Sequence, residues 1–383
     1  MDWFTHGTVG TFVGWSLPQR WAGPSAAALV VAGALLPDAE YFIDPFVDPQ
    51  SAFAHRGFTH SLFGVGILVP LAALVASRVG KEKRFARVVA LIALGMLSHV
   101  LFDLPTPMGA MLFYPFSRNH VQLDLLGYLD WTLFVLMLFV LLSAWSYANR
   151  DAAVRRGVLS AALLCGLSWW LFSEWPPLPF VFAATVEEAT EEPLRTVYPL
   201  VLGGVLLGLF VAFARKGWGF RQNRAVFGRI GIAALASYLA LCVTAQAIVL
   251  NLTQQFARER GIVVWKYAAS RMGYASLVGP LRWTGLVLAP EGVYLAQVDL
   301  FGARGLMFTL FPSTSENPFV ARSRSIPEVQ RFKSAARFPV TRYRVEKGWH
   351  IVEYQEYGRS WRPLLRVVLS ERQEVLTVGW IPH

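Results

Sequence analysis

A histidine and an aspartate lie one helical turn apart inside a strongly apolar stretch of the chain. The stretch is "LGMLSHVLFDLPTPMGA", residues 94–110, and it carries His99 and Asp103. Read as a helix, it places both side chains on the same face. Two polar groups in this arrangement either satisfy each other inside a helix bundle or hold a metal ion between them.

Further residues of the same types are concentrated in the N-terminal third. Five of the seven histidines lie within the first 120 residues, and carboxylates accompany them. Ionisable groups near membrane depth are costly, so they are functional candidates by default. The candidates are His6, Asp38, Glu40, His55, His60, His99, Asp103, His120 and Asp124.

The composition indicates that lipid surrounds the elements that carry these residues. The chain is 55% hydrophobic and only 16% charged, whereas a soluble domain is about 25% charged. Two short apolar runs, 7–17 and 25–36, predict a helical hairpin, since neither crosses the hydrocarbon comfortably alone. Six longer segments follow, several of them close to the ~20 residues of a membrane-spanning helix. These are 62–77, 88–104, 130–148, 157–172, 197–214 and 229–250.

The loops between these segments alternate in charge. One set of loops is basic: five basic residues lie in 78–87, five in 215–229, and an excess of basic residues in 149–156. The other set is not: a single basic residue lies in 105–129, and five glutamates lie in 173–196. The positive-inside bias therefore assigns the first set to the cytoplasm and the second to the outward side. The sequence predicts a mainly α protein, a multi-span transmembrane bundle of a hairpin plus about six spans, over residues 1–251.

The composition changes after about residue 252. Residues 252–383 contain stretches that are rich in β-branched and aromatic residues and punctuated by Gly and Pro, which is typical of an antiparallel sheet. This part has 18 Lys and Arg against 10 Asp and Glu. We expect a basic, β-rich extramembrane domain on the non-cytoplasmic side, which meets anionic lipid headgroups rather than nucleic acid.

The predicted topology gathers the candidate residues at one membrane face. His60 begins a segment after an outward loop, Asp103 ends the next segment on the outward side, and the hairpin brings the ends that carry His6 and Asp38 together. Imidazole and carboxylate groups suit zinc, and the same donors accept manganese or iron. Five or six ligands exceed the need of one catalytic zinc, so they suggest two ions, bridged by Asp103 beside His99.

Simpler interpretations exist for each residue taken alone. Any one histidine could only cap a helix or form hydrogen bonds inside the bundle. Asp38, after "LLP", could be a helix cap, and Arg56 in "HRGFTHS" could simply face headgroups. The gathering of five histidines on one side of the bilayer is what these interpretations do not explain.

Several motifs of the N-terminal third together resemble a known family. "THG", "LLPDAE", "HRGFTHS", "SHVLFDLPTPMG" and "LFYPFS", in this order, resemble the inner-membrane metal-dependent hydrolases of the YdjM type. The resemblance covers about residues 1–135, and it implies a bacterial inner-membrane, multi-pass protein with a metal-dependent activity.

A more distant likeness concerns the first stretch. Residues 94–110 are similar to the H-x-x-x-D-x-x-x-P-M-H segment of secreted zinc-dependent phospholipases C. The likeness implies ligand roles for His99 and for a bridging Asp103, completed by His6, Asp38 and His60. Gly109 departs from it, because that family has a histidine ligand there. A pair four residues apart, His120 and Asp124, could be a remnant of the remaining site.

The sequence-based hypothesis is a dizinc hydrolase that cleaves a phosphoester of a membrane phospholipid near the outward surface. The metals would lower the pKa of a bound water toward neutrality. Arg56 could bind a phosphate oxygen, His55 could be a ligand or proton shuttle, and Asp38 or Glu40 could be the general base. The alternatives are a lipid-binding protein with a structural metal and a divalent-cation transporter. The oligomeric state is left open.

Overall fold

The chain forms two compact units in the computed structural model. The first comprises residues 1–123, 128–241 and 275–279, and the second comprises 124–127, 242–274 and 280–383. The boundary expected at residues 251 and 252 stays a prediction, because one long helix runs through both units. The structure describes residues 2–42, 56–80, 82, 84–127, 129–172, 192–271, 275–276, 279–300, 307–358 and 364–381.

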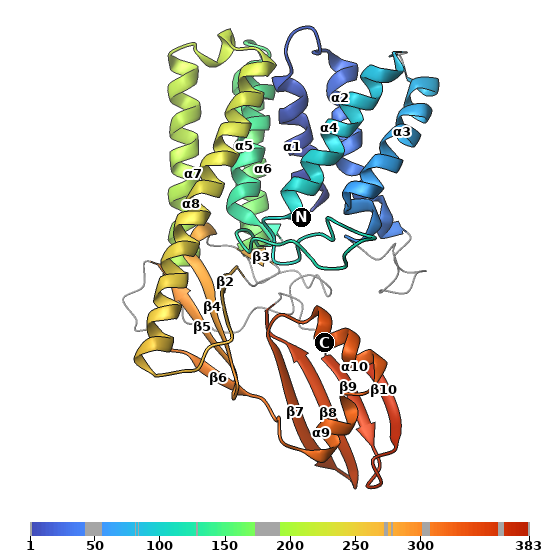
Figure 1. Ribbon diagram of the computed structural model, residues 1–383. Coiled ribbons are helices and arrows are strands. Elements are labelled where there is room, and N and C mark those ends of the chain that lie inside the picture. Colours follow the sequence, from blue (N-terminus) through green and yellow to red (C-terminus); the bar gives the residue numbers. More distant parts are fainter. Residues whose placement is uncertain are drawn as a thin grey trace. The chain divides into compact units, whose positions relative to one another are not determined.

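The first unit is built from helices, which run roughly side by side (Figure 1). A helix is present at each of the six long apolar segments and at both arms of the predicted hairpin. Only part of the last helix, up to residue 241, belongs to this unit. The helices are α1 (Trp3–Ser16), α2 (Pro24–Leu35), α3 (Leu62–Val79), α4 (Phe85–Asp103), α5 (Trp131–Tyr147), α6 (Ala153–Phe172), α7 (Glu192–Arg215) and α8 (Arg224–Glu259).

Short elements connect these helices. The 3-10 turns η1 (Pro37–Phe42) and η3 (Phe58–His60) follow α2 and precede α3, and η4 (Gly219–Arg221) precedes α8. A two-residue strand, β1 (Leu129–Asp130), pairs in parallel with β3 (Ala275–Ser276).

Close packing of α2 against α4 depends on glycine. A Cβ on Gly95 would lie 2.1 Å from the carbonyl oxygen of Val30, and one on Gly33 would lie 2.3 Å from that of Ile92. Small residues let helix backbones approach closely in a membrane, where packing rather than the hydrophobic effect drives association. The two backbones therefore touch near the ends that carry the candidate ligands.

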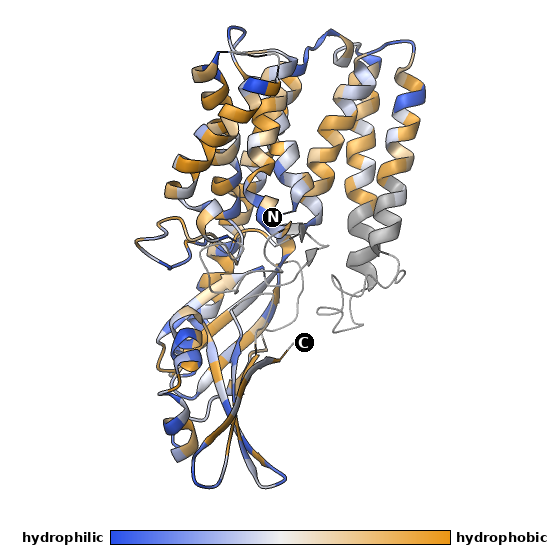
Figure 2. Cartoon of the chain, turned by 90° about the vertical axis from the view of Figure 1, so that its right-hand side faces the viewer, coloured by the Kyte–Doolittle hydropathy of each residue, from blue (hydrophilic) through white to orange (hydrophobic). Residues whose placement is uncertain are grey.

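Three helices in the described part of the chain are long and apolar enough to cross a membrane: α3, α4 and α8. Figure 2 shows the apolar residues along the helices of this unit. Large apolar side chains of α3 are exposed, among them Ile67, Leu71 and Val75, as expected for a helix that faces lipid. The mainly helical N-terminal part is confirmed, whereas the number of about six spans stays a prediction.

The second unit contains two four-stranded antiparallel sheets, which confirms the β-rich C-terminal part. Their strand orders are β2-β4-β5-β6 and β10-β9-β8-β7. The strands are β2 (Lys266–Ser270), β4 (Arg282–Ala289), β5 (Gly292–Asp299), β6 (Thr309–Pro312), β7 (Pro339–Glu346), β8 (Trp349–Glu356), β9 (Leu364–Leu369) and β10 (Val375–Ile381). A 3-10 turn, η5 (Gly279–Leu281), precedes β4.

Two short helices complete the second unit. They are α9 (Pro318–Ser323) and α10 (Pro327–Ala335). Val329 and Phe332 of α10 are buried in one cluster with Val352 and Leu365 of β8 and β9. The helices thus cover one face of the second sheet with an apolar core.

Candidate metal centre

Helix α4 delivers two polar side chains to the interior of the first unit. His99 and Asp103 lie one turn apart on its last turns, with 1% and 0% exposure. His99 Nε2 lies 3.4 Å from Asp103 Oδ2. The pairing expected from their spacing is therefore present.

Two 3-10 turns bring further polar groups to this pair. Asp38 lies on η1, directly after α2, and His60 ends η3, directly before α3. Ser61 caps α3 by accepting the Gly64 backbone N–H at 2.9 Å, and this fixes the turn that presents His60. Both side chains are buried.

Ligand atoms of four residues lie close together around two imidazole rings. His60 Nε2 lies 3.0 Å from His99 Nε2, 3.1 Å from Asp103 Oδ2 and 3.6 Å from Asp38 Oδ1. His99 Nε2 lies 3.5 Å from the same Asp38 oxygen. Zinc bonds of about 2.0–2.1 Å in a tetrahedron imply ligand separations of about 3.3 Å. The separations among His60, His99 and Asp103 therefore fit three ligands of a tetrahedral divalent cation.

The hydrogen bonds of the histidine rings select the nitrogen that faces this cluster. His99 Nδ1 lies 2.6 Å from the Ala34 carbonyl oxygen. A carbonyl only accepts, so Nδ1 carries the proton and Nε2 offers its lone pair. His60 Nδ1 lies 2.9 Å from Thr59 Oγ1 and 3.4 Å from Glu40 Oε1, and its Nε2 likewise faces the cluster. Such outer partners are typical of metal-binding histidines.

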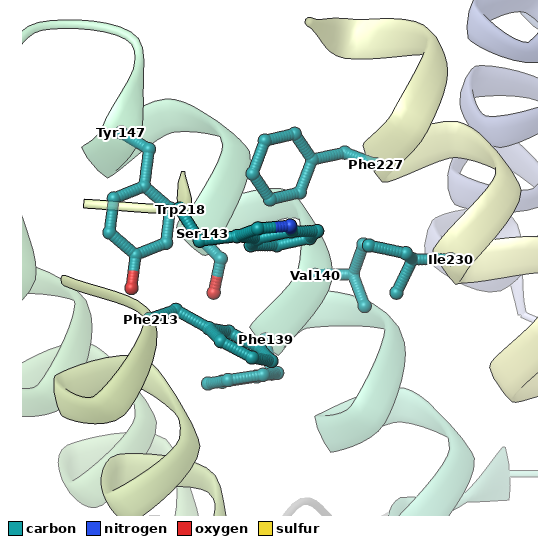
Figure 3. A pocket seen from close by; sticks show the side chains of 8 residues that line it. All are labelled: Phe139, Val140, Ser143, Tyr147, Phe213, Trp218, Phe227 and Ile230. Atoms are coloured by element: carbon teal, nitrogen blue, oxygen red, sulfur yellow. The ribbon is translucent and has the colours of Figure 1, made fainter. Parts of the chain in front are cut away.

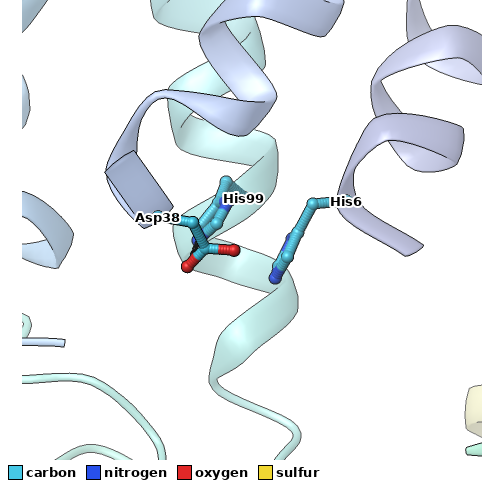
Figure 4. Close-up of side chains that lie close together, drawn as sticks. All are labelled: His6, Asp38 and His99. Carbon is cyan, nitrogen blue, oxygen red and sulfur yellow. Dashed lines mark ion pairs between the residues drawn. The ribbon is translucent and has the colours of Figure 1, made fainter. Parts of the chain in front are cut away.

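His6 from α1 completes the cluster. Its ring stacks on His99 with centroids 3.6 Å apart, and Figure 4 shows it beside His99 and Asp38. His6 Nε2 lies 3.4 Å from Asp103 Oδ1. Within the described residues, neither ring nitrogen of this fully buried side chain has a hydrogen-bond partner. Buried polar atoms without partners are costly, and a cation would satisfy the unprotonated one of these two nitrogens.

Two groups of residues in the described chain could each hold an ion. One is His6, Asp38 and His99, and the other is His60, His99 and Asp103. Both groups combine imidazoles with a carboxylate, and these side chains bind a divalent cation in their deprotonated forms.

Two further predicted site residues lie directly beside the cluster. The Glu40 carboxylate accepts the backbone N–H of Arg56 at 2.5 Å and the hydroxyl of Thr59. Arg56 Nη2 lies 3.0 Å from Asp103 Oδ1. Thr106, which the sequence analysis did not single out, accepts a hydrogen bond from Arg56 Nη1 at 2.7 Å. The only sequence signal for Thr106 is its position in the turn that follows Asp103.

Three predicted site residues remain: His55, His120 and Asp124. His55 lies outside the described residues. His120 is half-buried, and its Nδ1 lies 2.9 Å from the Met108 carbonyl oxygen. Asp124 accepts two hydrogen bonds from Arg337 within the second unit. Neither His120 nor Asp124 belongs to either metal-capable group of described residues, and their ligand roles stay predictions.

Gly109 stands where the phospholipase C pattern has a histidine. Its φ is +58°, and a Cβ there would lie 2.1 Å from the Val121 carbonyl oxygen. The backbone of this turn therefore requires glycine. The departure from that pattern follows from the local fold.

The part of the chain that holds the cluster is similar to known proteins. Residues 1–175 match the YdjM inner membrane protein family. The resemblance expected from the motifs is confirmed, and all five residues of the cluster lie within this YdjM segment. The chain is also similar to the inner membrane protein YbcI of Escherichia coli (strain K12), at 27% identity over 172 residues, which cover 43% of this chain and 95% of that protein. No solved structure matches.

Exposed aromatic side chains flank the ligand-bearing end of the YdjM segment. Trp3 and Phe42 lie 5.6 Å apart beside α1 and η1, and Phe63 and Phe116 lie 6.4 Å apart at the start of α3. All four are exposed. Trp is enriched at membrane–water interfaces, and Trp3 lies on the same helix as His6.

A second feature of the helical unit has a different chemistry. An apolar pocket lies between α5, α7 and α8, lined by rings such as Phe139, Trp218 and Phe227 (Figure 3). Its polar lining consists of the side chains of Ser143 and Tyr147. Its lining contains no imidazole or carboxylate, so this pocket lacks the groups that could bind a metal ion in the cluster.

Proposed function

We propose that this protein is a membrane-embedded, metal-dependent hydrolase that cleaves a phosphoester of a membrane phospholipid. The observation that carries the proposal is a buried cluster in which His60 Nε2 and His99 Nε2 lie 3.0 to 3.6 Å from each other and from carboxylate oxygens of Asp38 and Asp103. The match of residues 1–175 to the YdjM inner membrane protein family supports it.

The residues suit zinc, and we propose two ions. One would be held by His60, His99 and Asp103, and the other by His6 and Asp38. Bound zinc supplies a Lewis acid that activates water and stabilises negative charge on a phosphoryl oxygen.

The protein's own side chains hold this centre in one arrangement. The Ala34 carbonyl fixes the orientation of His99, and Glu40 with Thr59 fixes that of His60. Burial of the cluster excludes bulk water, which strengthens every electrostatic interaction inside it. In the proposed reaction, Glu40 is the candidate general base, because its carboxylate lies 3.4 Å from His60 Nδ1 beside the cluster and is not one of the proposed zinc ligands.

A lipid substrate is supported by the surroundings of the cluster. The exposed aromatic residues Trp3, Phe42, Phe63 and Phe116 lie at the ends of apolar elements. An amphiphile could therefore present its headgroup to the cluster while its acyl chains stay in the bilayer. The charge bias of the loops supports an outward-facing site, and the basic composition of residues 252–383 supports contact with anionic headgroups.

One observation favours a second function. The candidate ligands are all buried, and structural zinc sites are closed, without an open position. A membrane protein that binds lipid and uses zinc only to hold its fold would show the same buried cluster. The position of His6 beside Asp103 favours the hydrolase, because it adds a donor that a closed single-zinc site does not need.

The test combines metal content with activity. The detergent-purified protein and its His60→Ala variant are analysed for zinc per chain, and both are incubated with phosphatidic acid and phosphatidylglycerol in mixed micelles. We expect stoichiometric zinc and release of phosphate or a phosphorylated headgroup from the parent alone. Stoichiometric zinc without hydrolysis on either lipid would favour the structural metal, and a parent without zinc would overturn both functions.

A further inference from the structure

Arg56 is a fully buried arginine in a strained turn. Its side chain has no solvent exposure, and its φ of +64° lies in the left-handed region that non-glycine residues rarely adopt. Such strain persists only where surrounding contacts impose it. The contacts of Arg56 therefore indicate what the turn is built to do.

The backbone of Arg56 joins two segments that carry or support ligands. Its N–H donates to the Glu40 carboxylate, and its carbonyl accepts the N–H of Met111 at 3.0 Å. One bond leads to η1, which carries Asp38, and the other leads to the turn that follows α4. The residue thus sits where the Asp38, His60 and Asp103 segments meet.

The guanidinium group binds the end of α4 with both terminal nitrogens. Nη1 donates to Thr106 Oγ1 at 2.7 Å and to the Gly109 carbonyl at 3.2 Å, while Nη2 lies 3.0 Å from Asp103 Oδ1. Thr106 Oγ1 in turn donates to the Asp103 carbonyl at 2.7 Å. The fork geometry of arginine matches this set of acceptors, and a lysine point charge does not.

We propose that Arg56 is a positioning residue for the metal centre, and not the group that binds the substrate phosphate. It holds Asp103 Oδ1, so that Oδ2 faces His60 and His99, and it locks the His60 turn to the end of α4. This inference rests on the proposed metal-dependent function. It assigns to Arg56 a role in metal affinity that a substrate-binding arginine would not have.

The experiment measures metal binding without any substrate. Arg56→Lys, Arg56→Met and Thr106→Val are purified in detergent and titrated with zinc alone against a chromophoric chelator. The visible absorption spectrum of each protein loaded with cobalt alone reports the ligand geometry. The matched control is Arg87→Met. Arg87 is largely buried, as Arg56 is, but it lies near the start of α4, where it contacts Glu82 and the Trp21 carbonyl.

We expect both Arg56 variants to bind zinc about 10- to 100-fold more weakly, the effect typical of removing an outer partner of a metal ligand. Their cobalt spectra should change, while Arg87→Met keeps the parental affinity and spectrum. Thr106→Val should show a smaller loss in the same direction, and it decides the question if the Arg56 variants fail to fold.

Parental zinc affinity and cobalt spectra in the variants that fold would overturn the inference and leave the proposed function intact. A parent that binds no zinc would overturn the proposed function together with the inference. The two failures are therefore distinguishable in one set of titrations.

Discussion

In the first unit, five buried side chains form one cluster: His6, Asp38, His60, His99 and Asp103. Arg56 contacts Asp103 in this cluster, and His6 has no hydrogen-bond partner among the described residues. In the second unit, a buried carboxylate is satisfied by the chain itself. Asp124 accepts hydrogen bonds from both terminal nitrogens of Arg337, at 2.9 and 2.5 Å, and one from Ser270 at 3.2 Å.

The difference between these two centres is the balance of donors and acceptors. A carboxylate that receives a bidentate arginine has its charge and lone pairs satisfied. A cluster with three imidazoles and two carboxylates has more lone pairs than protons to share among them. Such an excess is satisfied in a buried site when a cation or additional protons complete it. Burial of polar residues alone therefore does not mark a candidate metal site, whereas this excess of lone pairs does.

The largest expected effect is on metal content. A double variant, His99→Ala with Asp103→Asn, removes one member of the first metal-capable group and two of the second. We expect complete loss of bound zinc by elemental analysis of the purified protein. Ser143→Ala, in the apolar pocket of the same unit, is the control and should keep the parental zinc content. Zinc retained in the double variant would show that the cluster is not the metal centre.

The second effect tests the self-satisfied centre. Arg337→Met leaves the Asp124 carboxylate without its partner. Breaking a buried ion pair costs about 3–5 kcal/mol, and we expect about 2–3 kcal/mol here because Arg337 is 12% exposed. Thermal unfolding in detergent measures the loss, and zinc content should stay parental. A parallel loss of zinc in Asp124→Asn would instead support the ligand role predicted for Asp124 from the sequence.

The third effect tests how the helices assemble the cluster. Gly95→Ala places a Cβ 2.1 Å from the Val30 carbonyl oxygen, and overpacking of this kind typically costs about 1–3 kcal/mol. Because α2 and α4 must separate, we also expect weaker zinc binding. Gly203→Ala on α7, where no atom lies within 4 Å of the added Cβ, is the matched control. Equal melting temperatures for the two variants would contradict the close α2–α4 contact.

The smallest effect concerns the apolar pocket. Tyr147→Phe removes the hydrogen bond from the Tyr147 hydroxyl to the Phe210 carbonyl oxygen, 2.6 Å in length. We expect a loss of about 1 kcal/mol in stability and no change in zinc content. Stability is measured by thermal unfolding, and zinc by elemental analysis. A change in zinc would mean that the pocket and the metal centre are coupled.

The sequence by itself determined the residue types of the cluster and the class of each half. Apolar segments of near-membrane length predicted the helices, and stretches rich in β-branched and aromatic residues predicted the C-terminal sheets, because these patterns are local in the sequence. The spacing of His99 and Asp103 fixed their common face. The motifs around them were sufficient to predict the YdjM resemblance, which the comparison confirmed over residues 1–175.

Only the tertiary structure decided how these residues meet. The contact of Gly33 and Gly95 with the facing helix sets the distance between α2 and α4, and no local pattern encodes that distance. The Ala34 carbonyl that orients His99 is a backbone group, which sequence motifs do not reveal. Arg56 and Asp124 are both charged residues near the motifs, yet one contacts Asp103 and the other contacts Arg337, 213 residues away in the chain. Partners so distant in sequence are chosen by packing, and packing is a property of the whole fold.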